Sequence, residues 1–131
     1  MPDFEVWDVV KVPFPHTNRP VQQRRPAAVI AVHEAPMAPR ILWVLMVTSA
    51  ANRGWPGDIA ISDLKMSGLP VPSLVRTAKI ATIEALDAEF IGRLPAIDCS
   101  LVSAALRLGL AKALDGLGIP KPRPTSFFAQ S

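Results

Sequence analysis

The chain has 131 residues, half of them apolar, and a formal net charge of +3. This length and hydrophobic content suit one folded domain with a modest core and exclude a wholly disordered chain, while the most apolar window, Ile41 to Val47, is far shorter than the roughly 20 residues that cross a bilayer. One cysteine, Cys99, excludes a disulfide framework and a cysteine-rich metal site, and the spacing of histidines and acids predicts neither a metal nor another cofactor.

The N-terminal segment, MPDFEVWD, is acidic and has no basic region followed by a long apolar run. It therefore lacks the pattern of a signal peptide and, with a single cysteine in the chain, suits a cytoplasmic protein. Val6 to Val12 alternates loosely between apolar and polar residues and predicts a first strand, which Pro13-Phe14-Pro15 should end. A polar loop from His16 to Arg24 follows.

Beyond this loop the pattern predicts short strands separated by turn residues. The expected strands cover Arg25–Val32, Ile41–Thr48, Asp58–Ser62, Ser73–Arg76, Lys79–Glu84 and Ile91–Ile97. The strand ending at Thr48 is rich in Val and Ile and should be largely buried, with Trp43 packed in the core. Between the strands, Glu34–Pro39 predicts a turn, Asn52–Gly57 a loop, and Asp63–Leu69 one helical turn ended by a glycine.

A final helix is predicted after Asp98, a fair N-cap residue. Apolar residues then recur at helical spacing, at Val102, Leu106, Leu110, Ala113 and Leu117. Gly116 and Gly118 should end the helix. Short strands followed by one helix favour a small, strongly bent barrel of the mainly β class over residues 1–118. The proline-rich segment 119–131, IPKPRPTSFFAQS, is expected to be an extended or flexible tail.

Basic residues are concentrated in the N-terminal half of the chain. Between Val9 and Gly57, six basic residues accompany one acid, a local charge of +5, whereas the remainder carries −2. This asymmetry suggests an anionic partner such as nucleic acid, although a solvated basic surface has the same signature. Within this region Arg24 and Arg25 directly precede a buried strand, and Pro26 restricts the backbone beside them. Arg25 is therefore either a functional residue whose orientation the proline and the strand restrict, or an ordinary surface arginine at a strand end.

Seven segments carry a wider pattern. They are, in order, WDVVKVPFP, QQRRPAAVIAV, ILWVLMVTSA, GDIAIS, SGLPVPSLVR, KIATIEA and FIGRLPAID, and they cover nearly all of the chain before the final helix. This order resembles the MazF/PemK family of toxin–antitoxin ribonucleases. The resemblance implies an SH3-like barrel of the MazF/PemK/CcdB type with a C-terminal helix, usually homodimeric. It also implies metal-independent, sequence-selective cleavage of single-stranded RNA, and silencing by a cognate acidic antitoxin that occupies the RNA groove.

The resemblance also assigns roles to residues of this chain. Arg25, before its proline, matches the family's main catalytic residue, and Thr48, which closes the central strand, matches its partner. The residues that would bind RNA are Arg19, Gln22, Arg24, Ser49, Arg76 and Lys79, although Lys79 also suits an ordinary position at a strand edge. His16, in the loop that gates the groove, is a candidate acid or base, although a lone loop histidine is more often simply exposed. Some members carry an aspartate two residues beyond the arginine that matches Arg76, and this chain has Ala78 there, which leaves the second proton-transfer group unassigned.

These residue types suit RNA cleavage without a metal. The 2′-OH of RNA attacks the adjacent phosphorus, and the products are a 2′,3′-cyclic phosphate and a 5′-OH. Arginine offers a planar fork of donors to phosphate oxygens, and a threonine hydroxyl adds a short-range donor, although Thr48 also suits an ordinary strand position. Trp55, in a loop, is a candidate for stacking on a base. Two alternatives remain: a topoisomerase-poisoning toxin like CcdB, and a non-catalytic RNA-binding barrel, which Ala78 favours.

Overall fold

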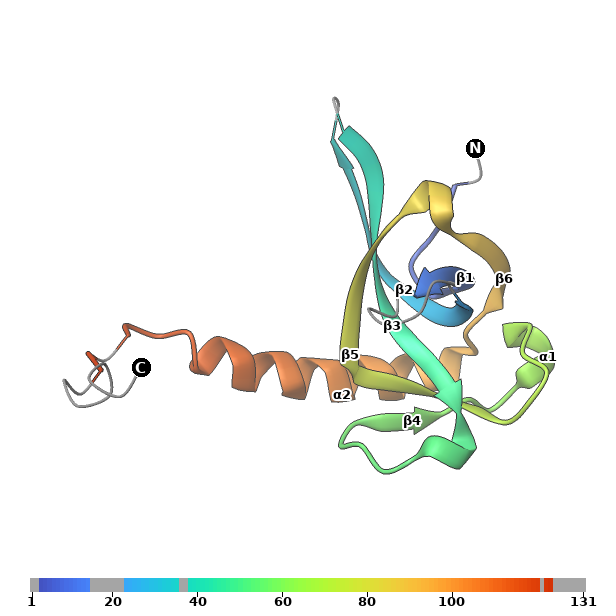
Figure 1. The fold of residues 1–131 in the computed structure, drawn as a ribbon. Helices are drawn as coiled ribbons and strands as arrows, with labels where there is room; N and C mark the ends of the chain where they lie inside the picture. Colours follow the sequence, from blue (N-terminus) through green and yellow to red (C-terminus); the bar gives the residue numbers. More distant parts are fainter. Residues whose placement is uncertain (1–2, 15–22, 36–37, 121, 124–131) are drawn as a thin grey trace.

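The computed structural model describes residues 3–14, 23–35, 38–120 and 122–123. Its main feature is an antiparallel six-stranded sheet in the order β4-β5-β3-β2-β1-β6. The strands are β1 (Asp8–Phe14), β2 (Gln23–Ala35), β3 (Ala38–Ser49), β4 (Asp58–Ala60), β5 (Ser73–Glu84) and β6 (Glu89–Arg93). The helices are α1 (Leu64–Ser67) and α2 (Ala96–Asp115), and the single 3-10 turns are η1 (Ala50–Asn52) and η2 (Ala85–Asp87). The predicted mainly β class with a C-terminal helix is confirmed (Figure 1).

The central strand β3 is covered on both sides. Val44, Leu45, Met46 and Val47 are all buried, although successive residues of a strand point to opposite faces. Val44 and Met46 pack with valines of β1 and β2, whereas Leu45 and Val47 pack with residues around α1 and with Val102 of α2. Burial on both faces is the reason that the segment ending at Thr48 is a nearly continuous apolar run.

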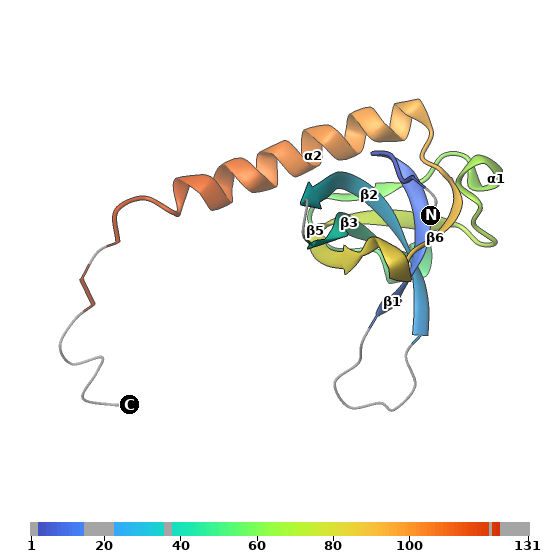
Figure 2. The same cartoon turned by 90° about the horizontal axis from the view of Figure 1, so that it is seen from above.

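The helix α2 crosses the sheet and then projects beyond it (Figures 1 and 2). Val102, in its first half, is fully buried, whereas Leu110 and Leu117 are 44% and 76% exposed. The helix and its end at the C-cap Gly116 are confirmed, but only its N-terminal half faces a core within this chain. Within the described ranges, no helix combines the length and hydrophobicity needed to cross a membrane.

Several strand boundaries differ from the predictions. β1 begins at Asp8, because Trp7 has a positive φ of 77° that does not fit an extended strand. β2 already begins at Gln23, so Arg24 is a strand residue and not a loop residue. The strands expected before and after residue 77 form one strand, β5, because β3 pairs with it at both ends.

The other turns and short elements follow the predictions closely. β2 continues to Ala35 and β3 begins at Ala38, so both strands reach into the turn predicted over Glu34–Pro39. Residues 36–37 lie outside the described ranges. The helical turn α1 is confirmed: the side chain of Asp63 caps its start, and Gly68 ends it in the left-handed region with φ 74°. The short strand β4 ends at Ala60, two residues before the predicted end.

The largest correction concerns the entry to α2. The strand predicted up to Ile97 ends at Arg93, and the helix begins at Ala96 with Pro95 at the N-cap, so Asp98 does not cap it. Asp98 lies buried in the first turn, where its carboxylate accepts hydrogen bonds from Ser62 N at 2.8 Å and Ser62 Oγ at 3.1 Å. It thus ties α2 to the residues that follow β4, and its charge suits the start of a helix.

Trp43 does not pack in the core as predicted. Its side chain is 46% exposed, and its ring contacts that of His33 with centroids 4.5 Å apart. Because Leu42 and Val44 on either side are buried, the alternation of the strand directs Trp43 outward.

Candidate active site

The first residues of β2 and the last residues of β3 meet at one groove. Ala27 pairs with Met46 in the antiparallel ladder, so Arg25 and Thr48, two residues further, lie at the same end and on the same face. Two adjacent hollows open there, with volumes of about 610 and about 170 Å³. The residues that line both hollows are Arg25, Val47, Thr48 and Asn52. We refer to the two hollows together as the Arg25 groove.

The Arg25 groove combines cationic, hydroxyl and apolar side chains. The larger hollow adds Lys11, Pro26, Ser49, Gly68, Leu69, Pro70, Val71, Ser73 and Ile91, and the smaller one adds Met46, Arg76 and Lys79. Among these described lining residues there is no carboxylate and no imidazole. Such a surface attracts a polyanion and offers apolar contacts to its uncharged parts. The described residues hold no group of three potential metal ligands.

Arg25 is half-buried in this groove and incompletely hydrogen-bonded. Its Nη2 donates to Gln23 Oε1 at 3.1 Å, whereas its Nε is buried and has no hydrogen-bond partner among the described residues. A buried donor without a partner typically costs about 1–3 kcal/mol, so a movement of the side chain that brought a ligand oxygen to this nitrogen would be favoured. Arg25 pairs with Val12 and the adjacent Pro26 with Lys11, which fixes the backbone on the β1 side.

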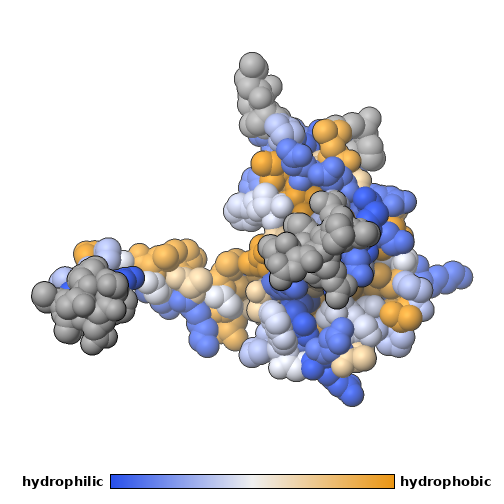
Figure 3. Space-filling model, in the orientation of Figure 1, coloured by the Kyte–Doolittle hydropathy of each residue, from blue (hydrophilic) through white to orange (hydrophobic). Residues whose placement is uncertain are grey.

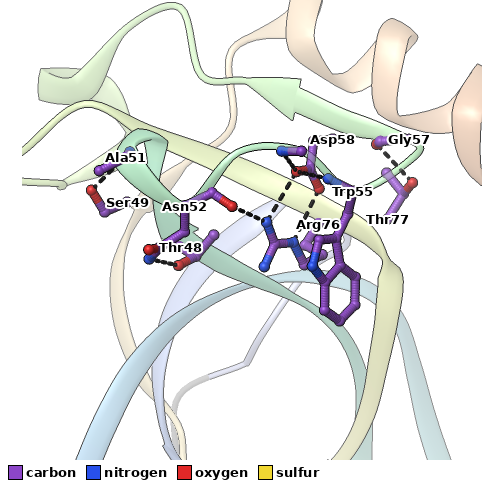
Figure 4. A network of polar contacts seen from close by, with 10 residues as sticks. Thr48, Ser49, Ala51, Asn52, Trp55, Gly57, Asp58, Arg76 and Thr77 are labelled. Atoms are coloured by element: carbon purple, nitrogen blue, oxygen red, sulfur yellow. Dashed lines mark hydrogen bonds and ion pairs between the residues drawn. The ribbon is translucent and has the colours of Figure 1, made fainter.

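Thr48 is held from the turn that follows β3. The amide nitrogen Nδ2 of Asn52 donates to Thr48 Oγ1 at 3.0 Å, across η1 (Figure 4). The neighbouring Ser49 is the N-cap of that turn, and its Oγ accepts the backbone N–H of Ala51 at 3.3 Å. Both hydroxyl groups therefore face defined partners, and Asn52 contributes to the groove beside them.

Arg76 is the centre of a polar network behind the smaller hollow. Its side chain is 10% exposed and forms a two-point ion pair with Asp58, Nε to Oδ1 at 3.1 Å and Nη2 to Oδ2 at 3.0 Å. The same Nη2 donates to the backbone oxygen of Asn52 at 2.7 Å. The hydrogen bond from Arg76 holds the pKa of the Asp58 carboxyl below its usual range, and the backbone N–H of Trp55 acts in the same direction. Arg76 is therefore engaged within the protein (Figure 4).

Trp55 covers this network from the solvent side. Its ring lies over the guanidinium of Arg76, with the carbon Cζ 4.3 Å from the ring centroid, and the residue is 47% exposed. Arg76 therefore has a cation–π contact in addition to its ion pair. The predicted stacking of Trp55 on a base stays a prediction; within the chain, it stacks on an arginine.

Comparison with known proteins decides the family. The model of the PemK-like, MazF-like toxin of type II toxin–antitoxin systems matches residues 5–110. The chain belongs to this family. The predicted resemblance is confirmed, and all the segments that suggested it lie within the matched range. No curated protein matches the chain.

Solved structures of PemK/MazF-type proteins share the fold. MazF from Deinococcus radiodurans covers 83% of this chain and 99% of its own, with 20% identity and a TM-score of 0.61. The MazE–MazF complex of that organism covers 82% and 97%, with 20% identity and a TM-score of 0.58. An endoribonuclease in complex with its cognate antitoxin, from a mycobacterial species, covers 88% and 97%, with 15% identity and a TM-score of 0.60. At these identities the likeness concerns the fold.

In this PemK/MazF-family chain, the two neighbouring arginines separate. Arg24 lies on the opposite face of β2 from Arg25, and its Nη2 donates to Lys11 O at 3.2 Å and Asp87 O at 3.4 Å. The same nitrogen is 3.7 Å from a carboxylate oxygen of Glu89. The structure therefore brings Arg25, Thr48, Ser49, Arg76 and Lys79 to one groove and leaves Arg24 on another surface.

Other predicted positions lie elsewhere or outside the described residues. His16, Arg19 and Gln22 lie outside the described ranges, so their predicted roles stay predictions. Ala78 lines a separate cavity of about 430 Å³ between β5 and α2 and does not line the Arg25 groove. In this member of the family, the described residues around the groove therefore supply donors and cations but no general base of the carboxylate or imidazole type.

Asn52 and Lys11 are among the groove residues that were not predicted from the sequence. Lys11 lies within the family-like segment WDVVKVPFP, and the alternation of that strand could have pointed to it. Asn52 follows Thr48 by four residues, but no sequence signal shows that the chain turns back through η1. Its role depends on a contact that only the folded turn creates.

Proposed function

We propose that this chain is an endoribonuclease toxin that cleaves single-stranded RNA without a metal ion and with selectivity for sequence. The observation that carries the proposal is the buried Nε of Arg25, which has no partner among the described residues, beside the Thr48 hydroxyl in a cationic groove. The family match over residues 5–110 supports the same activity class. The apolar side of the larger hollow, around Leu69 and Val71, offers contacts for nucleobases.

The proposed reaction is an internal transesterification. The 2′-oxygen of the RNA forms a bond to the adjacent phosphorus, and the bond from phosphorus to the 5′-oxygen breaks, leaving a 2′,3′-cyclic phosphate and a 5′-OH. Negative charge grows on the non-bridging phosphate oxygens as the phosphorane forms. Arg25 would bind these oxygens through the N–H groups of its guanidinium, and Thr48 would add a hydroxyl donor. His16 stays the candidate for proton transfer.

Two other functions are separated from this one by a single experiment. Purified protein is incubated with a long RNA in EDTA, and the products are resolved and mapped. Discrete cuts that persist in EDTA would support the proposed nuclease. Retention of RNA without cuts would support a non-catalytic RNA-binding barrel, which Ala78 in place of an acid favours. If the RNA were neither cut nor retained, the remaining alternative would be a toxin that acts on a protein, as CcdB does.

We also propose that the cognate antitoxin covers the Arg25 groove with an acidic segment. The groove is lined by Lys11, Arg25, Arg76 and Lys79 and by no described acid, so a carboxylate-rich segment is complementary to it. Raising the salt concentration about tenfold shortens the Debye length roughly threefold and should therefore weaken this complex. A cognate antitoxin fragment whose affinity did not change with salt would contradict the picture.

For the assembly we propose a homodimer. The exposed leucines of α2 and of the residues directly after it are Leu101, Leu108, Leu110, Leu114 and Leu117, and all but Leu101 lie in or beyond its projecting half. Figure 3 shows the hydrophobic surface that runs along this helix. Leu110 and Leu114, four residues apart, lie on the same side of the helix. An exposed apolar side of this kind is typical of an interaction site, and a second copy of the chain is the partner we expect.

A further inference from the structure

We propose that Asn52 is a positioning residue of the cleavage reaction: its side-chain amide orients the Thr48 hydroxyl so that the hydroxyl hydrogen points into the Arg25 groove. The inference rests on the proposed nuclease function and deepens it. It assigns Thr48 the part of a hydrogen-bond donor to the phosphate, and it assigns Arg76 and Asp58 the task of holding Asn52.

The first step is the contact between Asn52 and Thr48. β3 ends at Ser49, and the single turn η1 reverses the chain so that Asn52 lies back against Thr48. Its Nδ2 donates to Thr48 Oγ1 at 3.0 Å. Both residues line both hollows of the Arg25 groove, so the contact lies at the edge where RNA would bind.

The second step follows from the chemistry of a hydroxyl group. A threonine hydroxyl has one hydrogen to donate and two lone pairs that accept. The amide of Asn52 occupies one lone pair and, being a donor there, cannot receive the hydroxyl hydrogen. The hydrogen must therefore rotate away from Asn52, and the open side is the groove that contains Arg25. A hydroxyl arranged in this way is ready to donate to a phosphate oxygen as charge develops on it.

The third step is the support of Asn52 itself. Its backbone oxygen accepts a 2.7 Å hydrogen bond from Nη2 of Arg76, which in turn is held by the two-point ion pair with Asp58. Asp58 also accepts the backbone N–H groups of Gly54 and Trp55, at 3.3 and 3.1 Å, and so closes the loop from the other end. Figure 4 shows the chain of contacts from Asp58 through Arg76 and Asn52 to Thr48.

The test uses Asn52→Asp, which keeps the shape of the side chain but replaces the donor by an acceptor. The Thr48 hydroxyl would then donate to the carboxylate and turn away from the groove. We expect the single-turnover cleavage rate at saturating enzyme, in EDTA, to fall about 10²-fold at pH 7. A loss of this order is typical when one hydrogen-bond donor to a developing oxyanion is removed from an enzyme. Thr48→Val should show a loss of the same order. The substrate is an oligonucleotide that carries a cut site mapped on the long RNA.

A pH profile separates orientation from a general structural defect. As the pH falls toward about 4, the introduced carboxyl takes up a proton and can donate to Thr48 Oγ1 as the amide did. The deficit of Asn52→Asp relative to wild type should therefore shrink to less than about tenfold near pH 4, whereas the deficit of Thr48→Val should not. Adding Asn52→Asp to Thr48→Val should cause little further loss, because the two act as one unit.

Two further variants keep the result interpretable. Ala51→Asp places the same charge on the neighbouring exposed residue, so it should weaken RNA binding but preserve the rate at saturating enzyme. Asn52→Ala should lose about tenfold or less, because the hydroxyl is then free but not directed, and it serves if Asn52→Asp does not fold. If the wild type cuts RNA and Asn52→Asp has the same cleavage rate as Ala51→Asp at every pH, this inference is wrong while the proposed function stands. Wild type that does not cut would overturn the proposed function, and the inference with it.

Discussion

At the scale of single residues, neighbouring side chains of the same type have different surroundings. Arg25 extends into the groove with a buried nitrogen that has no partner among the described residues, whereas Arg24 is tied to backbone oxygens of Lys11 and Asp87. The difference follows from strand geometry, which sends successive side chains to opposite faces. Charge and residue type alone do not distinguish the two arginines, but position on the strand does.

Substitution of the two arginines should therefore give unequal results. Arg25→Ala should lose about 10²–10⁴-fold in single-turnover rate, with a much smaller loss of RNA affinity, because its contribution grows in the transition state. Arg25→Lys should restore little, since an ammonium group lacks the two-point fork. Arg24→Ala is the matched control and should cleave at close to the wild-type rate, in the same EDTA assay with melting temperatures alongside. An Arg25→Ala protein that folds, binds RNA and cuts normally would falsify the assignment.

At the scale of elements, the connection between β3 and β4 is organised by one ion pair. Arg76 of β5 and Asp58 of β4 are adjacent partners in the sheet, and together they hold the backbone of Asn52, Gly54 and Trp55. A second clamp lies one residue further along β5, where Thr77 Oγ1 donates to Gly57 O at 2.8 Å. The loop is therefore shaped by the sheet beneath it, and the groove takes one of its walls from that loop.

The ion pair predicts a particular dependence of stability on pH. The folded-state pKa of Asp58 is lowered, chiefly by the hydrogen bond from Arg76, so its stabilisation is fully present above the ordinary aspartate value and is lost as the pH falls through the lowered one. Asp58→Asn should cost about 1.5–3 kcal/mol of unfolding free energy at pH 7, as expected for hydrogen bonds to a charged group. In urea titrations this difference should shrink below about pH 4.

The control for this experiment is Asp115→Asn, at the exposed end of α2. It removes the same charge from the chain without touching the ion pair and should change the unfolding free energy by less than about 0.5 kcal/mol at either pH. A cost for Asp58→Asn that stayed constant from pH 7 to pH 3 would show that Asp58 acts through shape and not through its charge.

At the scale of the whole molecule, the chain covers only part of its apolar surface. The first half of α2 completes the core through Val102, whereas the second half leaves the barrel and exposes its leucines (Figures 2 and 3). Leucines that remain exposed along the projecting half are unfavourable in water, because moving apolar surface out of water lowers the free energy. We therefore expect that a partner covers this half of α2.

The homodimer is tested by light scattering. We expect a species of twice the 14.1 kDa chain mass at micromolar concentration. Leu110→Glu combined with Leu114→Glu should shift the protein to monomer, because two charges would be buried without partners. Arg107→Gln on the same helix is the control and should remain dimeric. A wild-type protein that scatters only as a single chain at this concentration would contradict the proposal.

The sequence by itself determined the features that local patterns encode. Alternating and continuous apolar runs predicted the strands, helical spacing predicted α2, and the proline after Arg25 marked the arginine that lies in the groove. The family resemblance pointed to Thr48 as its partner, and the two residues do share a groove. These inferences hold because strand and helix periodicity depend on neighbours close in the chain.

Only the tertiary structure decided which side chains meet across the chain. Asp98 caps no helix because Ser62, 36 residues earlier, supplies its hydrogen bonds, and Arg76 is engaged within the protein because Asp58, 18 residues earlier, pairs with it. Trp43 faces outward because Leu42 and Val44 on either side of it are buried, and successive side chains of a strand point to opposite faces. Asn52 reaches Thr48 only after a turn that the sheet stabilises. In each case a polar or aromatic group takes the partner that folding brings within hydrogen-bonding or packing distance, and sequence spacing does not specify that distance.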